Sequence, residues 1–273
     1  MMKNIDSMLN VVCGLLLFRY STAFVQTTLM PSTSRAPPVM SRSIVRLFDQ
    51  PNRLAEVYSL KNDFFVLRHG QSGADVERVI SSDPATDSYG LSYIGQMQAK
   101  EAAKKICELC NDYKSYNGIC ILTSNSPRAV ETAKAVEQAA KYYAYCPTQG
   151  LAGGQAQGQF SILPDERLRE RGFGKFDGTS DANYARVWDE DLKDSSHEVE
   201  GVESVDSVMA RITELVQVCE EHWKNHLVVL VGHNDVLQIL QVACFKAPGT
   251  EHRRVQALAT GEVRALMIGR PPR

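Results

Sequence analysis

The chain lacks an excess of positive charge: its 273 residues include 30 Lys and Arg against 32 Asp and Glu, a formal net charge of −2. Without a general basic field, no nucleic-acid partner is predicted, and any affinity for anions must come from arginines placed locally. Long apolar runs are also missing. The apolar segment at residues 9–18 has only about ten residues, too few to span a bilayer. No stable membrane association of the mature form is expected.

A disulfide framework is also lacking. There are seven cysteines, an odd number scattered through apolar segments, which fits a reducing compartment. Cys107 and Cys110 form a CxxC within a helical pattern, but no second pair or histidine cluster lies nearby, so we expect buried or partly buried helix cysteines rather than a zinc or redox site. The chain also lacks an Asp cluster for Mg²⁺. No metal and no cofactor are predicted.

Acidic residues are absent between Asp6 and Asp49, where hydroxyl residues and arginines are frequent. We therefore expect residues 1–49 to be a targeting presequence and residues 50–273 to form the folded domain. An apolar signal core followed by a basic, hydroxyl-rich segment, with Ala23-Phe24 at the junction, resembles the bipartite presequences of algal plastids with extra envelope membranes. Plastid (chloroplast) import is expected; a secretory signal, a mitochondrial signal or a disordered tail is the alternative.

Short apolar runs alternate with helical patterns along the rest of the chain. Strands are expected at residues 64–67, 118–123, 160–163, 227–231 and 263–268, and helices at 92–111, from 127 onward, at 184–192, after Ser204 and at 236–244. The strands are apolar throughout, which predicts an α/β fold: a three-layer α/β/α sandwich with a mostly parallel central sheet. The irregular stretch 73–89 and the region 146–191, which starts with a Gly- and Gln-rich loop, are expected to form a small cap.

Chemistry-bearing residues follow two of these strands directly. The first predicted strand ends in Arg68-His69-Gly70, and the run 227–231 ends in Gly232-His233. Arg128 lies in the first turn of a helix that Ser126-Pro127 begins. In a parallel sheet these side chains emerge at one edge, where open α/β sheets bind ligands. Two guanidinium groups and two imidazoles at one edge predict a phosphate site.

Four segments then carry a resemblance to a known family. They are Leu67-Arg68-His69-Gly70-Gln71-Ser72; Thr123-Ser124 with Pro127-Arg128-Ala129 and Glu131-Thr132-Ala133; Leu168-Arg169-Glu170-Arg171-Gly172-Phe173-Gly174 with Gly178; and Val231-Gly232-His233-Asn234. In this order and on these elements they resemble the phosphoglycerate-mutase-like histidine phosphatases, over about residues 62–270. One departure is Asn234, where the family usually has glycine.

The resemblance implies a phosphoglycerate-mutase-like fold and a covalent phosphohistidine. It makes His69 the nucleophile, attacking as neutral imidazole while its other nitrogen donates to a backbone carbonyl. Arg68, Arg128 and His233 would stabilise the phosphoryl group in transfer. Glu170 would act as general acid and base, provided burial raises its pKa.

Glu170 and the remaining histidines have alternative interpretations. Glu170 could instead form a surface salt bridge with Arg169 or Arg171, in which case Glu166 is the second choice of acid. For His197, His222, His226 and His252 a structural role is favoured.

Four further residues are predicted to bind substrate: Gln71, Ser72, Asp75 and Asn234. Asp75 stands where the family usually has Asn, and its carboxylate would repel an anionic substrate unless it points away or meets a cation.

Hydrolysis of a small phosphomonoester is the favoured activity. A cofactor-dependent mutase would need extra cations for the second acidic end of a phosphoglycerate, but the segment Trp188-Asp189-Glu190-Asp191 is acidic, with only Arg186 and Lys193 near it. Mutase activity is one alternative, and a catalytically weak phosphate-binding or interaction module is another. The particular substrate and the oligomeric state do not follow from the sequence.

Overall fold

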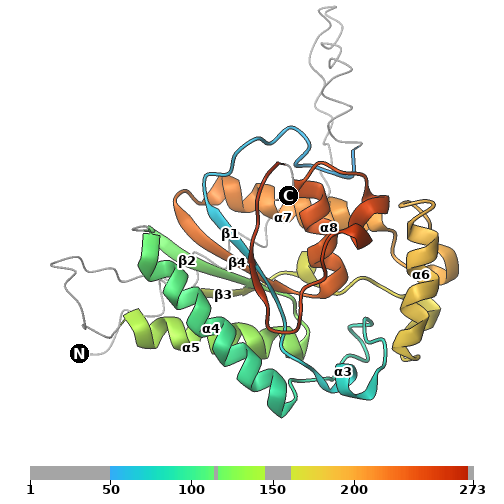
Figure 1. Ribbon diagram of the computed structural model, residues 1–273, viewed down its shortest axis with the longest axis horizontal. Coiled ribbons are helices and arrows are strands. Elements are labelled where there is room, and N and C mark those ends of the chain that lie inside the picture. The colour runs from blue at the N-terminus through green and yellow to red at the C-terminus, as the bar shows by residue number, and fades with distance from the viewer. Residues whose placement is uncertain (1–49, 114–115, 145–160, 270–273) are drawn as a thin grey trace, which may run out of the picture. The chain divides into compact units, whose positions relative to one another are not determined.

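The computed structural model describes residues 50–113, 116–144 and 161–269 (Figure 1). The predicted presequence 1–49 and the predicted loop 146–159 lie outside the described residues, so both stay predictions. Within the described ranges, no helix is long and apolar enough to cross a membrane.

A five-stranded sheet lies at the centre of the described residues. Its strands are β1 (Asp63–Arg68), β2 (Gly118–Thr123), β3 (Ser161–Pro164), β4 (His226–Gly232) and β5 (Val263–Ala265). They lie in the order β3-β2-β4-β1-β5, with β5 antiparallel to β1 and all other pairs parallel. The predicted mostly parallel sheet is confirmed. The last strand is shorter than expected, because it ends at Ala265 and not at Ile268.

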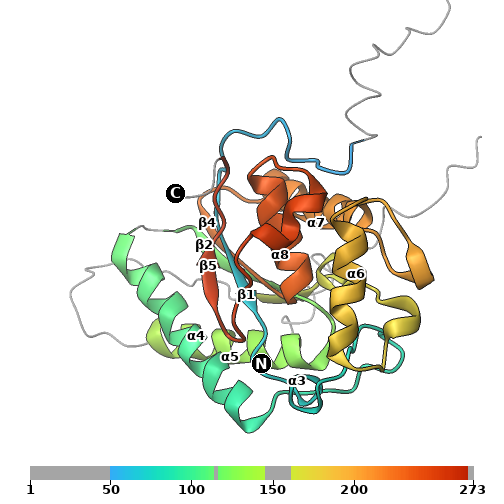
Figure 2. The ribbon, with the colours of Figure 1, turned by 45° about the vertical axis from the view of Figure 1, so that its right-hand side comes forward.

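Helices cover both faces of this sheet (Figures 1 and 2). On one side lie α4 (Tyr93–Tyr113) and α5 (Pro127–Ala144), and on the other α7 (Val205–His222) and α8 (Asn234–Cys244). Alternate residues of β4 serve the two layers: Val229 packs with α4 and α5, whereas Leu230 packs with α7 and α8. Burial on both faces explains why the strands are apolar throughout. The predicted three-layer α/β/α sandwich is confirmed.

The remaining elements are short. They are α3 (Gly73–Glu77), α6 (Tyr184–Asp191) and the 3₁₀ turns η1 (Glu166–Leu168), η2 (Gly174–Phe176), η3 (Asp181–Asn183), η4 (Val199–Gly201) and η5 (Gly249–Arg254). The stretch expected to be irregular, 73–89, thus begins with a helix. Ser72 caps it, and its side chain and that of Asp75 form a reciprocal capping box. The sequence reading missed this motif because Asp occupies the position where Glu or Gln is usual.

The stretch 73–89 packs on residues 161–191, the described part of the second region that was expected to form the cap. Ile80 N donates to Thr179 O at 2.8 Å, and Gly178 N donates to Ile80 O at 2.8 Å. Beneath these bonds, Ile80 and Phe173 share a small apolar cluster with Val187 of α6. The cap therefore has a core of its own, separate from the clusters on the two faces of the sheet.

The spacing of Ile94, Met97, Ala102, Ile106 and Leu109 predicts that these residues form the buried face of α4, and this prediction is wrong in the first turns of the helix. Ile106 is buried as expected, but Ile94 and Met97 are 55% and 52% exposed. The cause is Gly95, whose Cα packs directly on the backbone of Gln71: a Cβ there would lie 2.0 Å from the Gln71 carbonyl oxygen. Because this close approach turns Gly95 toward the core, Ile94 and Met97 point outward.

Truncations in α4 test this assignment. Ile106→Ala should lower the free energy of unfolding by about 2–5 kcal/mol because it leaves a cavity between α4 and the sheet. Ile94→Ala is the matched control and should change it by less than about 0.5 kcal/mol. Urea unfolding measures both. Equal losses in the two variants would contradict the burial described here.

Candidate active site

The register of β1 on β4 sets the site. Arg68 is the register partner of Gly232, so His69 and His233 leave the sheet side by side at the carboxyl ends of the strands. His69 N donates to Gly232 O at 3.0 Å, which continues the pairing by one residue. The two imidazole centroids lie 5.1 Å apart, with the ring planes at 63°. Both rings are buried.

Arg128, in the first turn of α5, bridges the two rings. Its Nε lies 3.3 Å from His69 Nε2, and its Nη2 lies 3.4 Å from His233 Nδ1. Glu170 approaches from the loop after η1, with Oε2 3.6 Å from His233 Nδ1. The structure therefore brings together side chains that lie between 59 and 105 residues apart along the chain wherever Arg128 joins the two histidines.

His69 is oriented through its other nitrogen. Nδ1 lies 2.8 Å from Gly70 O, so a hydrogen on Nδ1 satisfies that carbonyl and leaves the lone pair on Nε2, facing Arg128. The predicted contact with a backbone carbonyl is present. Burial, reinforced by the charge of Arg128, lowers the pKa of His69 to about 3. The imidazole is consequently neutral near pH 7, as a nitrogen nucleophile requires.

Glu170 has the opposite shift. Burial, together with the negative charge of Asp235, raises the pKa of the Glu170 carboxyl to about 7. Its Oε1 accepts a hydrogen bond from Arg171 N at 2.9 Å. The second-choice acid, Glu166, is exposed. Near neutrality Glu170 can therefore both donate and accept a proton.

The alternative salt bridges of Glu170 do not form, because its neighbours pair elsewhere. Arg169 donates to Glu203 at 2.8 Å. Arg171 is fully buried and makes a two-pronged pair with Asp191 of α6, both N–O distances being 2.7 Å. The acidic segment at the end of α6 thus turns the Asp191 carboxylate inward, where it neutralises Arg171 in the loop that carries Glu170. The sequence analysis treated Asp191 only as part of an acidic segment near the cap and did not predict this pair.

His233 is held by serines from the loop that follows β2. Its Nε2 lies 2.9 Å from Ser124 Oγ and 3.4 Å from Ser126 Oγ. Burial and the charge of Arg128 hold the pKa of His233 well below its usual value, so this ring too is neutral in the free protein. The sequence reading gave Ser126 only a helix-capping role and assigned none to Ser124.

Arg68 and Arg128, the two arginines predicted to hold phosphate, each pair with a carboxylate from the stretch 73–89. Arg68 Nη2 lies 3.3 Å from Asp75 Oδ1, so Asp75 meets a cation, which is one of the two ways to relieve the predicted repulsion. Arg128 Nη1 lies 2.7 Å from Asp87 Oδ1, with both side chains almost completely buried. Arg128 Nη2 also donates to Ser81 O at 2.9 Å. Asp87 was missed because nothing local in its loop indicates a partner 41 residues away.

The other predicted substrate ligands have partners within the protein. Ser72 Oγ bonds to Asp75, and Gln71 Oε1 accepts from Ser92 Oγ at 2.7 Å. Asn234 bonds to Gln238 and to the Leu258 peptide. Contact between these side chains and a substrate stays a prediction.

A cavity of about 50 Å³ adjoins Glu170 and Arg169. Its remaining lining comes from the cap and from the loop after β2: Ser82, Pro84, Asp87, Ser124, Asn125, Ser126 and Pro127. The cavity is small, most of its lining residues are polar, and it lies between the loop that carries Glu170 and the start of α5. It can admit a small polar group beside Glu170 and beside Ser124, whose hydroxyl bonds to His233.

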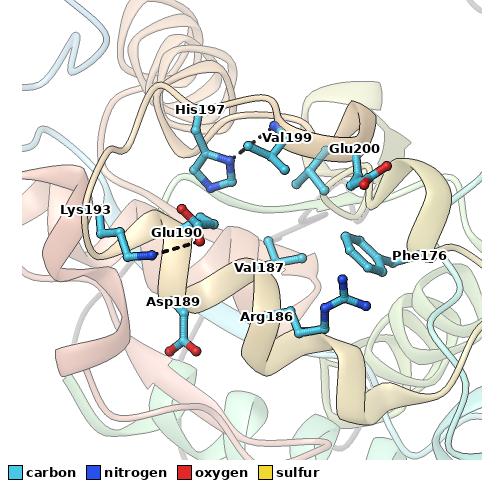
Figure 3. A pocket seen from close by; sticks show the side chains of 10 residues that line it. Phe176, Arg186, Val187, Asp189, Glu190, Lys193, His197, Val199 and Glu200 are labelled. Carbon is cyan, nitrogen blue, oxygen red and sulfur yellow. Dashed lines mark hydrogen bonds and ion pairs between the residues drawn. The ribbon is translucent and has the colours of Figure 1, made fainter.

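A larger pocket of about 310 Å³ lies against α6 and contains none of the predicted catalytic residues (Figure 3). Arg186 and Lys193, the cations that the sequence reading noted near the cap, both line it. There Arg186 stacks on Phe176 at 5.1 Å, and Lys193 pairs with Glu190 at 2.8 Å. Within the described ranges, no three His, Cys, Asp or Glu side chains are grouped so that they could hold a metal ion.

A family model described as the histidine phosphatase superfamily, branch 1, matches residues 64–270. The chain belongs to this superfamily. The match spans all four motifs, and the histidine pair, the bridging arginine and the buried glutamate lie within it.

Solved structures of other proteins share the fold. A mycobacterial glucosyl-3-phosphoglycerate phosphatase is 23% identical, with 74% of this chain and 88% of that one covered and a TM-score of 0.57. YhfR from Bacillus stearothermophilus is 22% identical over 75% and 90%, with a TM-score of 0.56. A putative α-ribazole-5′-P phosphatase from Escherichia coli is 18% identical over 74% and 89%, with a TM-score of 0.53. No curated protein sequence gives a significant match.

The raised pKa of Glu170 makes stability depend on pH. The Glu170 carboxyl keeps its proton up to about pH 7 in the folded state but loses it near pH 4.5 in the unfolded state. Between these two values the folded state binds more protons, so the free energy of unfolding falls as the pH rises. Glu170→Gln removes this loss. Its unfolding free energy relative to wild type should therefore rise by about 2 kcal/mol from pH 5 to pH 8.

The exposed Glu166 supplies the control for this measurement. Glu166→Gln should show the same pH dependence of unfolding as wild type, measured by urea titration across the same range. A Glu170→Gln variant that also tracks wild type at every pH would mean that the carboxyl titrates normally.

Proposed function

We propose that this histidine phosphatase hydrolyses a small phosphomonoester through a covalent phosphohistidine on His69. The observation that carries the proposal is the His69 ring itself: it is buried and neutral, and its bond to Gly70 O leaves the Nε2 lone pair directed at Arg128, with the centroid of the His233 ring 5.1 Å from its own. A nucleophile that faces a guanidinium and a second imidazole is suited to attack a phosphoryl group.

The charges around His69 support the same assignment. Arg68 and Arg128 would hold the phosphoryl oxygens, with His233 as a further hydrogen-bond donor once it is protonated or reoriented. Arg68 Nε is buried and has no hydrogen-bond partner among the described residues. Because an unsatisfied buried donor is costly, a phosphoryl oxygen that accepts from it would gain this energy on binding.

The proposed reaction has two steps. His69 Nε2 forms a bond to phosphorus as the ester P–O bond breaks, and Glu170 gives its proton to the departing alkoxide oxygen. Glu170, now a carboxylate, takes a proton from water as that water attacks phosphorus and the P–N bond breaks. Inorganic phosphate leaves and both residues regain their starting states. A glutamate with a pKa of about 7 suits both steps.

Hydrolysis is favoured over mutase activity by the pairing of nearby cations. Arg169 bonds to Glu203 and Arg171 to Asp191, while Arg253, which stacks on Trp188, bonds to Asp235. Each of these guanidinium groups already has a carboxylate. A mutase must retain a doubly anionic intermediate while it reorients, and these pairs would compete with its second acidic end. Two of the structural neighbours are named as phosphatases, of glucosyl-3-phosphoglycerate and, as putative, of α-ribazole-5′-P.

The roles of His69 and Glu170 can be separated by the leaving group. His69→Ala should abolish turnover of every substrate. Glu170→Gln should lower kcat/KM for an alkyl phosphate by about 10²- to 10⁴-fold, and much less for p-nitrophenyl phosphate, whose phenolate leaves without a proton. With p-nitrophenyl phosphate the variant should release a burst of p-nitrophenol and accumulate a phosphorylated His69, detected by mass spectrometry after alkaline quenching.

The same assays address the alternatives. No turnover of any phosphomonoester by folded wild-type protein would favour the phosphate-binding module, and isomerisation of phosphoglycerates without net phosphate release would favour the mutase. Equal losses with both leaving groups in Glu170→Gln would remove Glu170 as the acid.

We also propose that residues 1–49 direct the protein to a plastid with extra envelope membranes. A fluorescent protein fused behind these residues should reach the plastid of an alga of that kind, and Phe24→Ala in the fusion should leave it outside. Microscopy with plastid, mitochondrial and secretory markers measures the outcome. Secretion or mitochondrial labelling of the unaltered fusion would contradict the proposal.

A further inference from the structure

The segment that leads into β5, residues 255–262, lies against Arg68 and holds it from several directions. Arg68 Nη1 donates to Leu258 O at 2.9 Å. Arg68 N donates to Glu262 O at 3.2 Å, and Gly261 N lies 3.1 Å from the carbonyl oxygens of both Arg68 and His69. The position of the guanidinium therefore depends on where residues 255–262 lie.

Asn234 fixes that segment from the other side. Its Oδ1 accepts from Leu258 N at 3.1 Å, and its Nδ2 donates to Gln238 Oε1 at 3.0 Å. Gln238 Nε2 in turn donates to Val255 O at 2.6 Å. The Leu258 side chain is 1% exposed and packs in the core beneath α8. Leu258 is thus bonded through its N–H to Asn234 and through its carbonyl to Arg68.

We propose that Asn234 is a positioning residue for Arg68, acting through Leu258. The side-chain amide sets the Leu258 backbone so that its carbonyl engages Nη1, while Asp75 engages Nη2. Each outer nitrogen then uses one of its two N–H groups within the protein, and the second N–H of each, together with the unpartnered Nε, remains as a donor for a phosphoryl oxygen. This inference rests on the proposed phosphate site but assigns Asn234 differently from direct substrate contact.

The residue type at 234 matters for a physical reason. Leu258 N needs an acceptor and Gln238 Oε1 an additional donor, and an amide supplies both from one planar group. Alanine or glycine supplies neither. Without Asn234, Leu258 N would lose its side-chain partner and the segment would be less restrained, so the guanidinium would spend less time in the binding geometry.

A double-mutant cycle tests the coupling. Asn234→Ala should weaken inorganic phosphate binding, measured by calorimetry, and lower kcat/KM for p-nitrophenyl phosphate by about tenfold, mainly through KM. In an Arg68→Met background the same change should have little further effect, because the group that Asn234 positions is gone. A merely structural role for Asn234 predicts the same fold loss in both backgrounds.

Controls keep the outcomes separate. Asn117→Ala removes an exposed asparagine that bonds to Lys224 O, and should leave phosphate binding and KM at wild-type values. If Arg68→Met does not fold, as judged by its thermal transition, Arg68→Gln replaces it in the cycle.

The two proposals can fail independently. Coupling seen in phosphate binding without any turnover would leave this inference standing and overturn the phosphatase assignment. If instead the protein turns over phosphomonoesters but the effects of Asn234→Ala and Arg68→Met are independent, the phosphatase assignment stands and the positioning role of Asn234 is overturned.

Discussion

The parallel pairing of β1 with β4 is the constraint on which the site depends. Because Arg68 and Gly232 are register partners, the residues that follow them leave the sheet at one level, and two imidazoles meet at 5.1 Å. A shift of one residue in this register would turn each apolar side chain of β4 toward the opposite helix layer, where its size and shape do not match its neighbours. The packing that stabilises the sheet therefore also sets the spacing of His69 and His233.

Burial then sets the protonation of the site. The same exclusion of water lowers the pKa of His69 to about 3 and raises that of Glu170 to about 7, since it disfavours the charged form of each. The result near neutrality is a neutral imidazole in the same site as a carboxyl that keeps its proton up to about pH 7. Shifts in opposite directions at neighbouring groups are typical of acid–base pairs in enzyme sites.

The cations of the site are balanced within the protein. Asp75 and Asp87, both from the cap, neutralise Arg68 and Arg128, and Asp191 neutralises the buried Arg171 beside Glu170. A buried ion pair adds little net stability, but loss of one partner would leave an uncompensated charge. These pairs therefore favour one arrangement of the cap over the sheet edge, and the cap contributes to the electrostatics of the site as well as covering it.

Much of this could be predicted from the sequence alone. The apolar runs, the helix-start signals and the four motifs determined the layers and named His69, His233, Arg128 and Glu170, because each depends on local periodicity or on a short motif. Ile94, Asp87 and Asn234 were different. The outward turn of Ile94 follows from a glycine contact with another segment, the partner of Asp87 lies 41 residues away, and Asn234 bonds to a peptide 24 residues further along.

The sequence by itself therefore determined the family, the order of the elements and which candidate groups stand at the ends of those elements. Only the tertiary structure decided how those groups are held, protonated and neutralised. The physical reason is that hydrogen bonds, ion pairs and desolvation depend on distances between atoms, and distances between segments far apart in the chain exist only once the chain has folded.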